Sequence, residues 1–350
     1  MRIHEATKEI EQGEHLTREE ARAVMGELLS GTVSDADIAQ FLVALRDKGE
    51  CAEELIGFAE VMRARAGEGL RQAGVDPEQL ARGQPLLDTC GTGGVPQRGI
   101  NVSTAAALVV AAAGVRVAKH GNRSISSRCG SADVLEALGV ALELPFQHIP
   151  ACLEETGMVF LYAPRLHLAM KHVMKARQSL KTKTVFNLLG PLTNPLRASV
   201  QLLGVYDRAR TEMMAQTLAT LGTQRAFVVA GHDGLDEITL TGLTRLSECE
   251  GGAVRSRDVA PEDFGLARVA GEVLRGGDPA TNARLLQRVL EGELGPYRDV
   301  VLANASAALV VAGRAADFRA GVERARAALD SGAALAKLRA LAAFTQKFAG

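Results

Sequence analysis

The length, composition and charge of the chain restrict the classes of protein it can belong to. Its 350 residues exceed the usual size of one domain, about 100–200 residues, so two structural units are expected. A hydrophobic share of 47% and a charged share of 23% are typical of a folded chain and exclude wholesale disorder. The formal net charge of -1 argues against binding through many clustered basic residues, so no nucleic-acid partner is expected.

The cysteines and the apolar runs indicate the cellular compartment of the protein. Its 5 cysteines are scattered without C-x-x-C spacing, which predicts neither a disulfide framework nor a zinc site and fits a reducing cytoplasm. The first residues are charged and lack the apolar core of a signal peptide. The longest apolar run, 105–115, is too short to span a bilayer. A cytoplasmic location without membrane contact is therefore expected.

The first part of the chain has the pattern of short helices. Thr17-Arg-Glu-Glu20 has the form of a capping box, and Ser34 with Asp37 repeats the signal. Glycines punctuate these segments at Gly31, Gly49 and Gly67. Apolar residues recur at helical spacing at Ile38, Phe41, Leu42 and Leu45. The pattern predicts four short helices before residue 67, in a helical domain over 1–75, with 68–84 as the best candidate linker.

From Pro85 onward, short β-type runs alternate with helical ones. The β-type runs are 86–90, 115–119, 158–162, 184–189, 200–206 and 225–230. The helical runs are 103–114, 131–139 and 210–221, and the tail from Pro296 is helical again. Alternation of this kind predicts a mostly parallel sheet covered by helices. The expected fold class is therefore α/β, with the sheet in a larger domain over 76–350.

Two polar segments follow predicted strands and are suited to phosphate binding. Asp88–Gly94 is rich in glycine and precedes a helix that opens at Asn101–Thr104; glycines let backbone N–H groups approach an anion, and a helix start adds donors. Spacing alone leaves a tight turn capped by Ser103 equally open. Lys119–Ser127 packs two cations, an amide and three hydroxyls around one glycine. A solvated polar loop is the weaker alternative there.

Two further features indicate a metal and a carboxylate ligand. Asp236 and Glu237 are adjacent carboxylates after a predicted strand, which suits Mg²⁺ together with substrate phosphates. An acidic turn is the simpler explanation of that pair when no other context is considered. Arg177 lies on the apolar stripe of a predicted helix over 170–180 and needs a partner there. It either extends to water or a protein carboxylate, or it is a fork for a substrate carboxylate.

Six segments, in this order along the chain, resemble the anthranilate phosphoribosyltransferase family. They are GTGG, NVST, KHGNRSISS, GSADVLEALG, VFNLLGPLTNP and DGLDEITLTG. Several long motifs in order are far more specific than any single one. The resemblance implies an Mg²⁺-dependent pentosyltransferase of tryptophan biosynthesis. Such an enzyme transfers phosphoribose from phosphoribosyl pyrophosphate to the amino group of anthranilate and releases pyrophosphate.

The resemblance also implies an architecture and an assembly. The fold is expected to be of the nucleoside phosphorylase/phosphoribosyltransferase type, with a small helical N-terminal domain beside a larger α/β domain. A later segment around 165–185 is expected to complete the helical domain. A homodimer associated through the helical domains is expected.

The family's pattern assigns site residues to positions of this sequence. Phosphoribosyl pyrophosphate would be held by Gly91, Gly94, Val95, Gly99, Asn101, Val102, Ser103, Thr104, Lys119, His120, Gly121, Asn122, Arg123, Ser124, Ser126, Ser127 and Ser131. Mg²⁺ would be bound by Ser103, Asp236 and Glu237. Anthranilate would lie along Gly91, Asn122, His167 and Arg177. Lys119 and Arg177 are the residues implied to act in catalysis.

Three positions depart from the family's pattern. Val95 stands where Asp is usual, Gly99 replaces a hydroxyl residue and Leu168 replaces a proline. A hydrogen bond to a charged group is worth about 1.5–3 kcal/mol, so we expect an active enzyme with an altered response to Mg²⁺ and cosubstrate. Two alternatives share the architecture: a pyrimidine nucleoside phosphorylase-like enzyme, and a catalytically weakened relative that binds nucleic acid. The balanced charge and the two adjacent carboxylates oppose the second.

Overall fold

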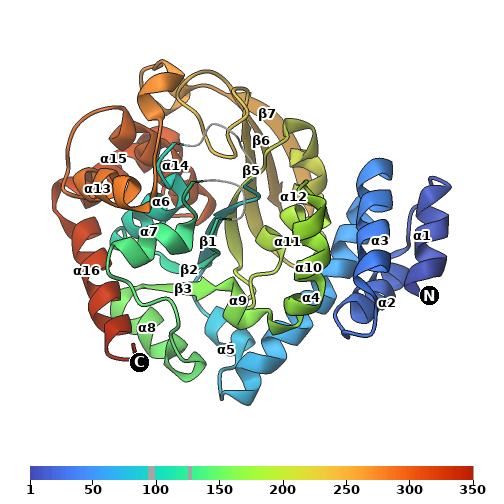
Figure 1. Ribbon diagram of the computed structural model, residues 1–350. Coiled ribbons are helices and arrows are strands. Elements are labelled where there is room, and N and C mark those ends of the chain that lie inside the picture. The colour runs from blue at the N-terminus through green and yellow to red at the C-terminus, as the bar shows by residue number, and fades with distance from the viewer. Residues whose placement is uncertain (94–98, 125–127, 350) are drawn as a thin grey trace.

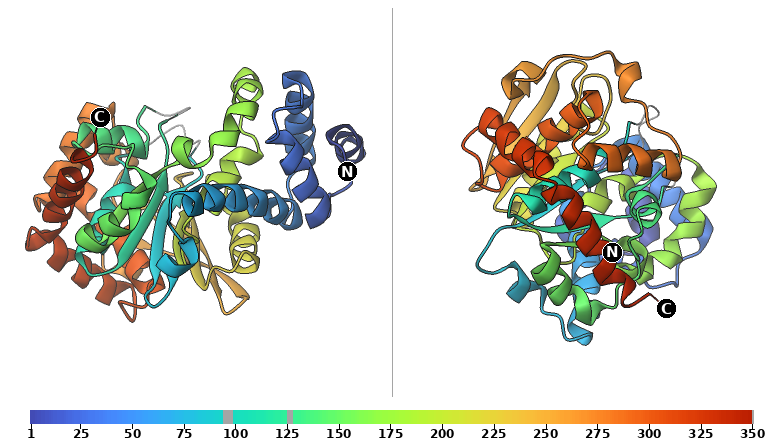
Figure 2. Two further views of the ribbon diagram at one scale, coloured as in Figure 1. Left: turned by 90° about the horizontal axis from the view of Figure 1, so that it is seen from below. Right: turned by 90° about the vertical axis from the view of Figure 1, so that its left-hand side faces the viewer.

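The computed structural model describes residues 1–93, 99–124 and 128–349. A helical N-terminal part lies beside a larger α/β part, as the fold class predicted (Figure 1). The N-terminal helices are α1 (Ile3–Glu11), α2 (Arg18–Leu28), α3 (Asp35–Lys48) and α4 (Ala52–Gln72). In Figure 2, α4 reaches from these helices to the sheet, so it links the two parts of the molecule.

The predicted start of α2 is confirmed in detail, whereas the end of α4 is not. The Thr17 hydroxyl accepts a hydrogen bond from the Glu20 backbone N–H at 3.3 Å, and the Glu20 carboxylate accepts one from Thr17 at 2.9 Å. Gly67, expected between segments, lies inside α4. The helix therefore runs 21 residues. The expected linker 68–84 contains the end of α4 and helix α5 (Pro77–Ala81).

The sheet has 7 strands in the order β3-β2-β1-β4-β5-β6-β7. The parallel strands are β1 (Leu86–Gly91), β2 (Arg116–Gly121), β3 (Met158–Tyr162), β4 (Val200–Gly204) and β5 (Arg225–Gly231). Two antiparallel strands, β6 (Thr244–Glu250) and β7 (Ala253–Val259), extend it beyond β5. The five strands from β3 to β5 in this order run the same way, which confirms the expectation of a mostly parallel sheet. The direction in which successive strands are added reverses between β1 and β4.

One predicted strand is wrong and one hairpin was not predicted. The apolar run 184–189 forms part of helix α11 (Val185–Leu192). The Thr184 backbone N–H donates to the Asn187 side-chain oxygen at 3.0 Å, and the Asn187 N–H donates to the Thr184 carbonyl at 2.8 Å. These local bonds start a helix. Strands β6 and β7, by contrast, were missed because polar and charged residues interrupt their apolar pattern.

Helices cover both faces of the sheet. The remaining long helices are α6 (Val102–Ala112), α7 (Ser131–Ala137), α8 (Ile149–Thr156), α10 (Lys171–Leu180), α12 (Thr211–Thr220), α13 (Pro279–Leu290), α14 (Pro296–Val311), α15 (Phe318–Asp330) and α16 (Ala333–Gln346). Alternate residues of β5 point to opposite faces of the sheet. Phe227 and Val229 belong to one hydrophobic core, with residues of α6 and α14. Ala226 and Val228 belong to a second core, with residues of α11 and α12.

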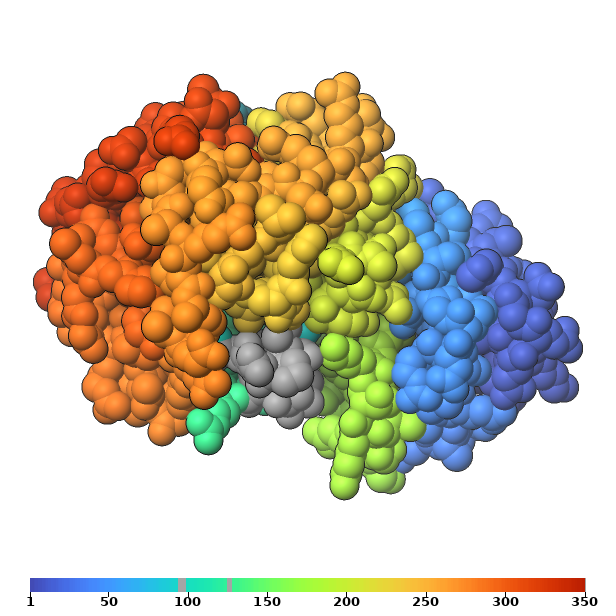
Figure 3. Space-filling view, turned by 90° about the horizontal axis from the view of Figure 1, so that it is seen from above, coloured from blue at the N-terminus to red at the C-terminus, as the bar shows by residue number. Residues whose placement is uncertain are grey.

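Helix α10 lies far from the N-terminal helices in sequence but packs against α3. Val173 and Ala176 of α10 are buried in the same core as Phe41 and Leu45 of α3. Figure 3 shows the light-green segment of α10 beside the blue N-terminal helices. Within the ranges that the structure describes, no helix combines the length and apolar character needed to cross a membrane.

The packing of α2 on α4 requires a glycine, which gives a stability prediction. A Cβ at Gly57 would collide with the Arg18 carbonyl oxygen and lie 2.8 Å from the Ala21 Cβ, whereas a Cβ at Gly26 meets nothing within 4 Å. Gly57→Ala should lower the free energy of unfolding by about 1–3 kcal/mol through overpacking. The control Gly26→Ala should raise it by about 0.5–1 kcal/mol. Denaturant unfolding measures both, and equal effects would contradict this packing.

Candidate functional site

A cleft of about 1270 Å³ opens at the carboxyl ends of the parallel strands. Ligand sites of open α/β sheets occur at this edge, where the strand order reverses. Site residues predicted from the sequence that line it are Gly91, Gly99, Asn101, Val102, Ser103, Lys119, His120, Gly121, Asn122, Arg123, Ser124, Ser131, His167, Arg177, Asp236 and Glu237. Gly94, Val95, Ser126 and Ser127 lie outside the described residues. Thr104 is buried one turn into α6, and no partner for its hydroxyl is found in the described part of the chain.

The glycine turn after β1 is held against Asp236. The Gly93 backbone N–H donates to Asp236 Oδ2 at 2.8 Å. A Cβ at Gly91 would lie 2.5 Å from the same oxygen, and a Cβ at Gly204 would collide with the Asp236 backbone. Both strand ends therefore need glycine so that the carboxylate can approach. This contact brings together two segments 143 residues apart.

Lys119 is a buried cation at the base of the cleft. It is only 1% exposed, and its Nζ donates to the Thr89 carbonyl and, at 3.2 Å, to the Ser103 hydroxyl. Burial lowers the pKa of Lys119, and the nearby charges of Asp88 and Glu237 oppose that shift. The Glu237 carboxylate in turn accepts from the Ser103 N–H at 3.2 Å. Ser103 thus links the ammonium group to the carboxylate.

Asp88 is a buried residue that supports the site without lining the cleft, and the sequence assigned it no role. It is fully buried, and its carboxylate accepts hydrogen bonds from the His120 N–H at 3.1 Å and the Asn194 amide at 2.8 Å. Burial raises the pKa of Asp88, and these donors and Lys119 oppose the shift. Asp88 is the first residue of the glycine-rich segment Asp88–Gly94 and lies inside β1, and this position was the available signal. Asp88 fixes β2 relative to β1 where both enter the cleft.

His120 and His167 form an uncharged wall. Their rings meet edge to face with centroids 5.2 Å apart. Burial lowers the pKa of His120 to about 4 and the pKa of His167 to about 3. The Gly190 carbonyl lies 3.2 Å from His120 Nδ1; because a carbonyl can only accept, Nδ1 carries the proton and Nε2 is an acceptor. The pair can contact an aromatic ring without adding charge.

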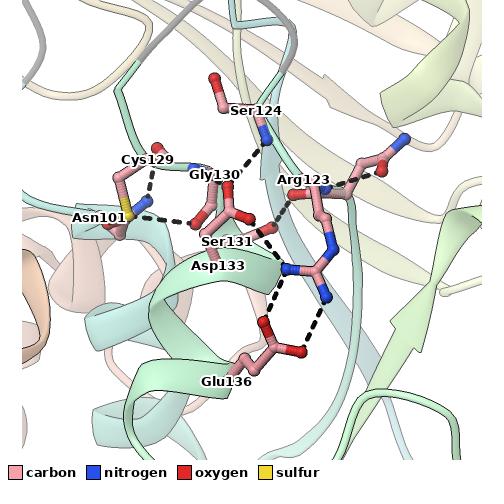
Figure 4. Close-up of polar contacts among 9 residues, drawn as sticks. Asn101, Arg123, Ser124, Cys129, Gly130, Ser131, Asp133 and Glu136 are labelled. Atoms are coloured by element: carbon pink, nitrogen blue, oxygen red, sulfur yellow. Dashed lines mark hydrogen bonds and ion pairs between the residues drawn. The ribbon is translucent and has the colours of Figure 1, made fainter. Parts of the chain in front are cut away.

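Carboxylates of α7 bind Arg123, Ser124 and Gly130, which lie in the segment that follows β2 in the chain, as Figure 4 shows. Asp133 Oδ2 accepts from the backbone N–H of Ser124 at 3.0 Å and of Gly130 at 2.8 Å. The Arg123 guanidinium donates to Asp133 at 3.2 Å and makes two hydrogen bonds of 2.7 Å to Glu136. Burial would raise the pKa of Asp133, but these donors hold it below its usual value. Asp133 therefore ties both ends of the segment together.

Arg177 reaches the cleft from α10, as its place on the helical stripe suggested. Its guanidinium carbon lies 5.8 Å from the centroid of the Phe186 ring. No carboxylate pairs with it among residues 1–93, 99–124 and 128–349. Burial lowers the pKa of Arg177, although an arginine stays charged at neutral pH. A partly buried guanidinium of this kind is suited to a planar carboxylate ligand.

Two departures from the family's pattern have visible surroundings. A Cβ at Gly99 would lie 2.6 Å from the Leu274 carbonyl oxygen, so a hydroxyl residue there would require the chain around Leu274 to shift. Leu168 begins a short 3-10 helix before α10 and is 67% exposed on the cleft. The third departure, Val95, lies outside the description.

Comparison with known protein families fits both parts of the chain. Residues 83–335 match the α/β domain of a glycosyl transferase family, and residues 4–66 match the helical bundle domain of that family. The two matches therefore place the chain in the class of glycosyl transferases that combine these two domains.

The relatives narrow the family further. The anthranilate phosphoribosyltransferase of Solibacter usitatus is 51% identical over 331 residues, 95% of each chain, and that of Geotalea uraniireducens is 48% identical over 99% of this chain and 100% of its own. The Thermus thermophilus enzyme structure has a TM-score of 0.87 at 43% identity, covering 97% of this chain and 99% of its own. The Saccharomyces cerevisiae enzyme in complex with PRPP and Mg has a TM-score of 0.83 at 27% identity, covering 99% and 98%. The chain belongs to the anthranilate phosphoribosyltransferase family.

The bonds of Asp133 give a prediction for loop closure. Asp133→Ala leaves two backbone N–H groups without their acceptor, so the KM for phosphoribosyl pyrophosphate should rise about 10-fold, the value of one charge-assisted hydrogen bond. Glu136→Ala is the matched control, because it removes an exposed ion pair of Arg123, worth about 0–1 kcal/mol, and no backbone contact. Steady-state kinetics measure the KM of the two variants, and their melting temperatures are compared to exclude a folding defect. Equal KM values for the two variants would contradict the role of Asp133.

Proposed function

We propose a residue assignment for the activity of this family, the transfer of the phosphoribosyl group from phosphoribosyl pyrophosphate to anthranilate. The activity follows from family membership over the whole chain. The observation that carries the assignment is the meeting of four separate features at one cleft. They are the glycine turn, the buried Lys119, the carboxylates Asp236 and Glu237, and Arg177, which has no carboxylate partner among the described residues.

The phosphorylated cosubstrate would occupy the side of the cleft next to the sheet. The turn at Gly91–Gly93, the start of α6 at Asn101–Ser103 and the segment Asn122–Ser124 surround that side with backbone N–H groups and hydroxyls. Groups of these kinds bind phosphate oxygens. The N–H groups of Gly93, Ser103 and Ser124 donate to carboxylates here, so a phosphate would take over these donors. The related yeast enzyme is described in complex with PRPP and Mg, which supports this part of the assignment.

Mg²⁺ would be bound by Asp236, Glu237 and Ser103. Oxygen donors of this kind are the ligands that Mg²⁺ prefers, with water and phosphate oxygens completing the shell. The fit rests on the Asp236 contact with the glycine turn and the Glu237 contact with Ser103, which bring both carboxylates to the phosphate side. The bound ion would supply positive charge to the pyrophosphate oxygens.

The aromatic substrate would lie on the side formed by α10 and the histidines. Arg177 would bind its carboxylate, and the neutral rings of His120 and His167 would contact its ring. A yeast relative is described in complex with 4-fluoroanthranilate, which supports an aromatic site in the family. Gly91 and Asn122 border the passage from there to the phosphate side.

These positions lead to a mechanism in which binding and charge dominate. The amine nitrogen forms a bond to ribose C1 while the bond from C1 to the pyrophosphate oxygen breaks, pyrophosphate leaves with the electron pair, and the amine loses a proton to water. Lys119 and the backbone N–H groups stabilise the leaving charge. An aryl amine is nucleophilic when neutral, so the buried histidines are not needed as strong bases. Alignment in the cleft is the main contribution of the chain.

The assembly and location proposed for the chain follow its family and composition. The helical domain would comprise residues 1–75 with the 165–185 segment, as the packing of α10 on α3 supports, and residues 76–350 would form the second domain. We propose a homodimer through the helical domains and a cytoplasmic location, with no nucleic-acid partner. Neither a nucleoside phosphorylase-like activity nor nucleic-acid binding is favoured by a specific feature of the cleft.

The metal assignment predicts an altered requirement for Mg²⁺. Glu237→Gln keeps the shape and the acceptor for Ser103 but removes a charge, so half-maximal activity should need about 10-fold more Mg²⁺, and chelation should abolish the activity of both proteins. Glu248→Gln, a change at a carboxylate that pairs with Arg225 away from the cleft, is the control. A Glu237→Gln enzyme with an unchanged Mg²⁺ titration would refute the assignment.

The anthranilate assignment predicts that geometry as well as charge matters at Arg177. Arg177→Met should raise the KM for anthranilate by about 10- to 100-fold, and Arg177→Lys should restore only part of the loss because a lysine cannot bind a carboxylate through two parallel hydrogen bonds. Arg165→Met, which removes an exposed arginine paired with Glu143, is the control. If instead the KM for phosphoribosyl pyrophosphate alone changes, Arg177 does not bind the carboxylate.

A further inference from the structure

Lys183 is a cation of the cleft that none of the recognised motifs includes. It lies on the short connection between α10 and α11 and lines the cleft. Its Nζ stands 3.7 Å from the centroid of the Tyr206 ring. Within the described ranges it makes no ion pair and no hydrogen bond through Nζ. The side chain is half-buried, and its ammonium group is in contact with the Tyr206 ring.

The neighbours of Lys183 show which side of the cleft it serves. The Tyr206 backbone N–H donates to the Thr92 hydroxyl at 3.0 Å, and the Thr92 N–H donates to the Gly204 carbonyl at 2.9 Å. Thr92 directly precedes Gly93, which binds Asp236. The ammonium group therefore stands against the residue that anchors the glycine turn. Asp236, the expected metal ligand, is also among the carboxylates whose charge reaches Lys183.

Two arginines, one facing the same ring and one lining the cleft, are paired with carboxylates. Arg210, which also faces the Tyr206 ring, is paired with Glu50 at 2.7 Å. Arg123 is bound by Glu136. Among residues 1–93, 99–124 and 128–349, Lys183 contacts only an aromatic face, which leaves most of the capacity of its three N–H donors unused. A half-buried ammonium without a carboxylate partner is an incomplete site for an anion.

We propose that Lys183 binds the pyrophosphate end of the cosubstrate, and the released pyrophosphate, beside the glycine turn. The Tyr206 ring holds the ammonium in place through a cation–π contact, and the anion completes its coordination. This inference rests on the proposed function, because that function puts the pyrophosphate on this side of the cleft. Lys183 then shares the leaving charge with Lys119, the buried cation at the base of the cleft.

Burial and charge around Lys183 are consistent with this role. Burial lowers the pKa of Lys183, and the nearby carboxylates of Asp207 and Asp236 oppose that shift. An arriving pyrophosphate adds negative charge and favours the protonated lysine. The ammonium group is therefore most strongly stabilised when the anion is bound.

The test separates pyrophosphate binding from anthranilate binding. Lys183→Met keeps an apolar side chain against Tyr206 and removes the charge, whereas Lys183→Arg keeps the charge. Calorimetry with inorganic pyrophosphate and Mg²⁺ gives the affinity, and steady-state kinetics give KM for each substrate. Lys183→Met should weaken pyrophosphate binding and raise the KM for phosphoribosyl pyrophosphate by roughly 5- to 30-fold. The anthranilate KM should be unchanged, and Lys183→Arg should recover most of the loss.

The control is Lys175→Met, which removes a lysine of α10 that is 86% exposed and paired with Asp35 outside the cleft. Lys175→Met should have the pyrophosphate affinity and KM values of the unaltered enzyme. Equal melting temperatures of the variants and the unaltered enzyme exclude a folding defect. If Lys183→Met is unstable, Lys183→Gln takes its place. Unchanged pyrophosphate affinity in Lys183→Met, or a change in the anthranilate KM alone, would overturn the inference. Failure of the unaltered enzyme to convert the two substrates would instead overturn the proposed function. The calorimetric comparison would still show whether Lys183 binds pyrophosphate.

Discussion

The close approach of Asp236 to the ends of β1 and β4 is the constraint on which the cleft depends. Side chains at Gly91 or Gly204 would collide with this residue, and its carboxylate accepts the Gly93 N–H. The contact therefore fixes the positions of the glycine turn, the carboxylate pair and the two strand ends relative to one another. It also explains why glycines recur at the ends of two neighbouring strands: the loop after β5 must lie directly on them.

The buried ammonium of Lys119 depends on that arrangement. Removing a charge from water is costly unless opposite charge and hydrogen bonds replace the solvent. Thr89 and Ser103 supply the hydrogen bonds, while Asp88 and Glu237 supply the charge. Because Glu237 adjoins Asp236, displacement of the carboxylate loop would leave the cation undercompensated. The stability of the fold and the electrostatics of the site are thus linked through the same residues.

Much of this fold could be predicted from sequence, because strands and capped helices have strong local signals. The run Met158–Tyr162 is a strand with the predicted bounds, and the Thr17 cap is present. The run 184–189 was assigned wrongly as a strand because it is mostly apolar, and a short apolar run has no period that separates strand from helix. The motifs also foretold most of the residues gathered in the cleft. Asp133 was quoted in a motif but its bonds to Ser124 and Gly130 depend on loop closure, which spacing does not encode.

The cations of the cleft suggest how one site accommodates two anionic substrates. Lys119 is surrounded by hydrogen-bond acceptors and carboxylates that belong to the protein itself. Arg177 and Lys183 contact aromatic rings and have no carboxylate partner in the parts of the chain described. Cations of this second kind contribute more when a ligand supplies the missing charge, because the water around them is then replaced by a partner. Both cations therefore lie on one stretch of chain, α10 and its connection to α11, and α10 packs against α3 of the N-terminal helices.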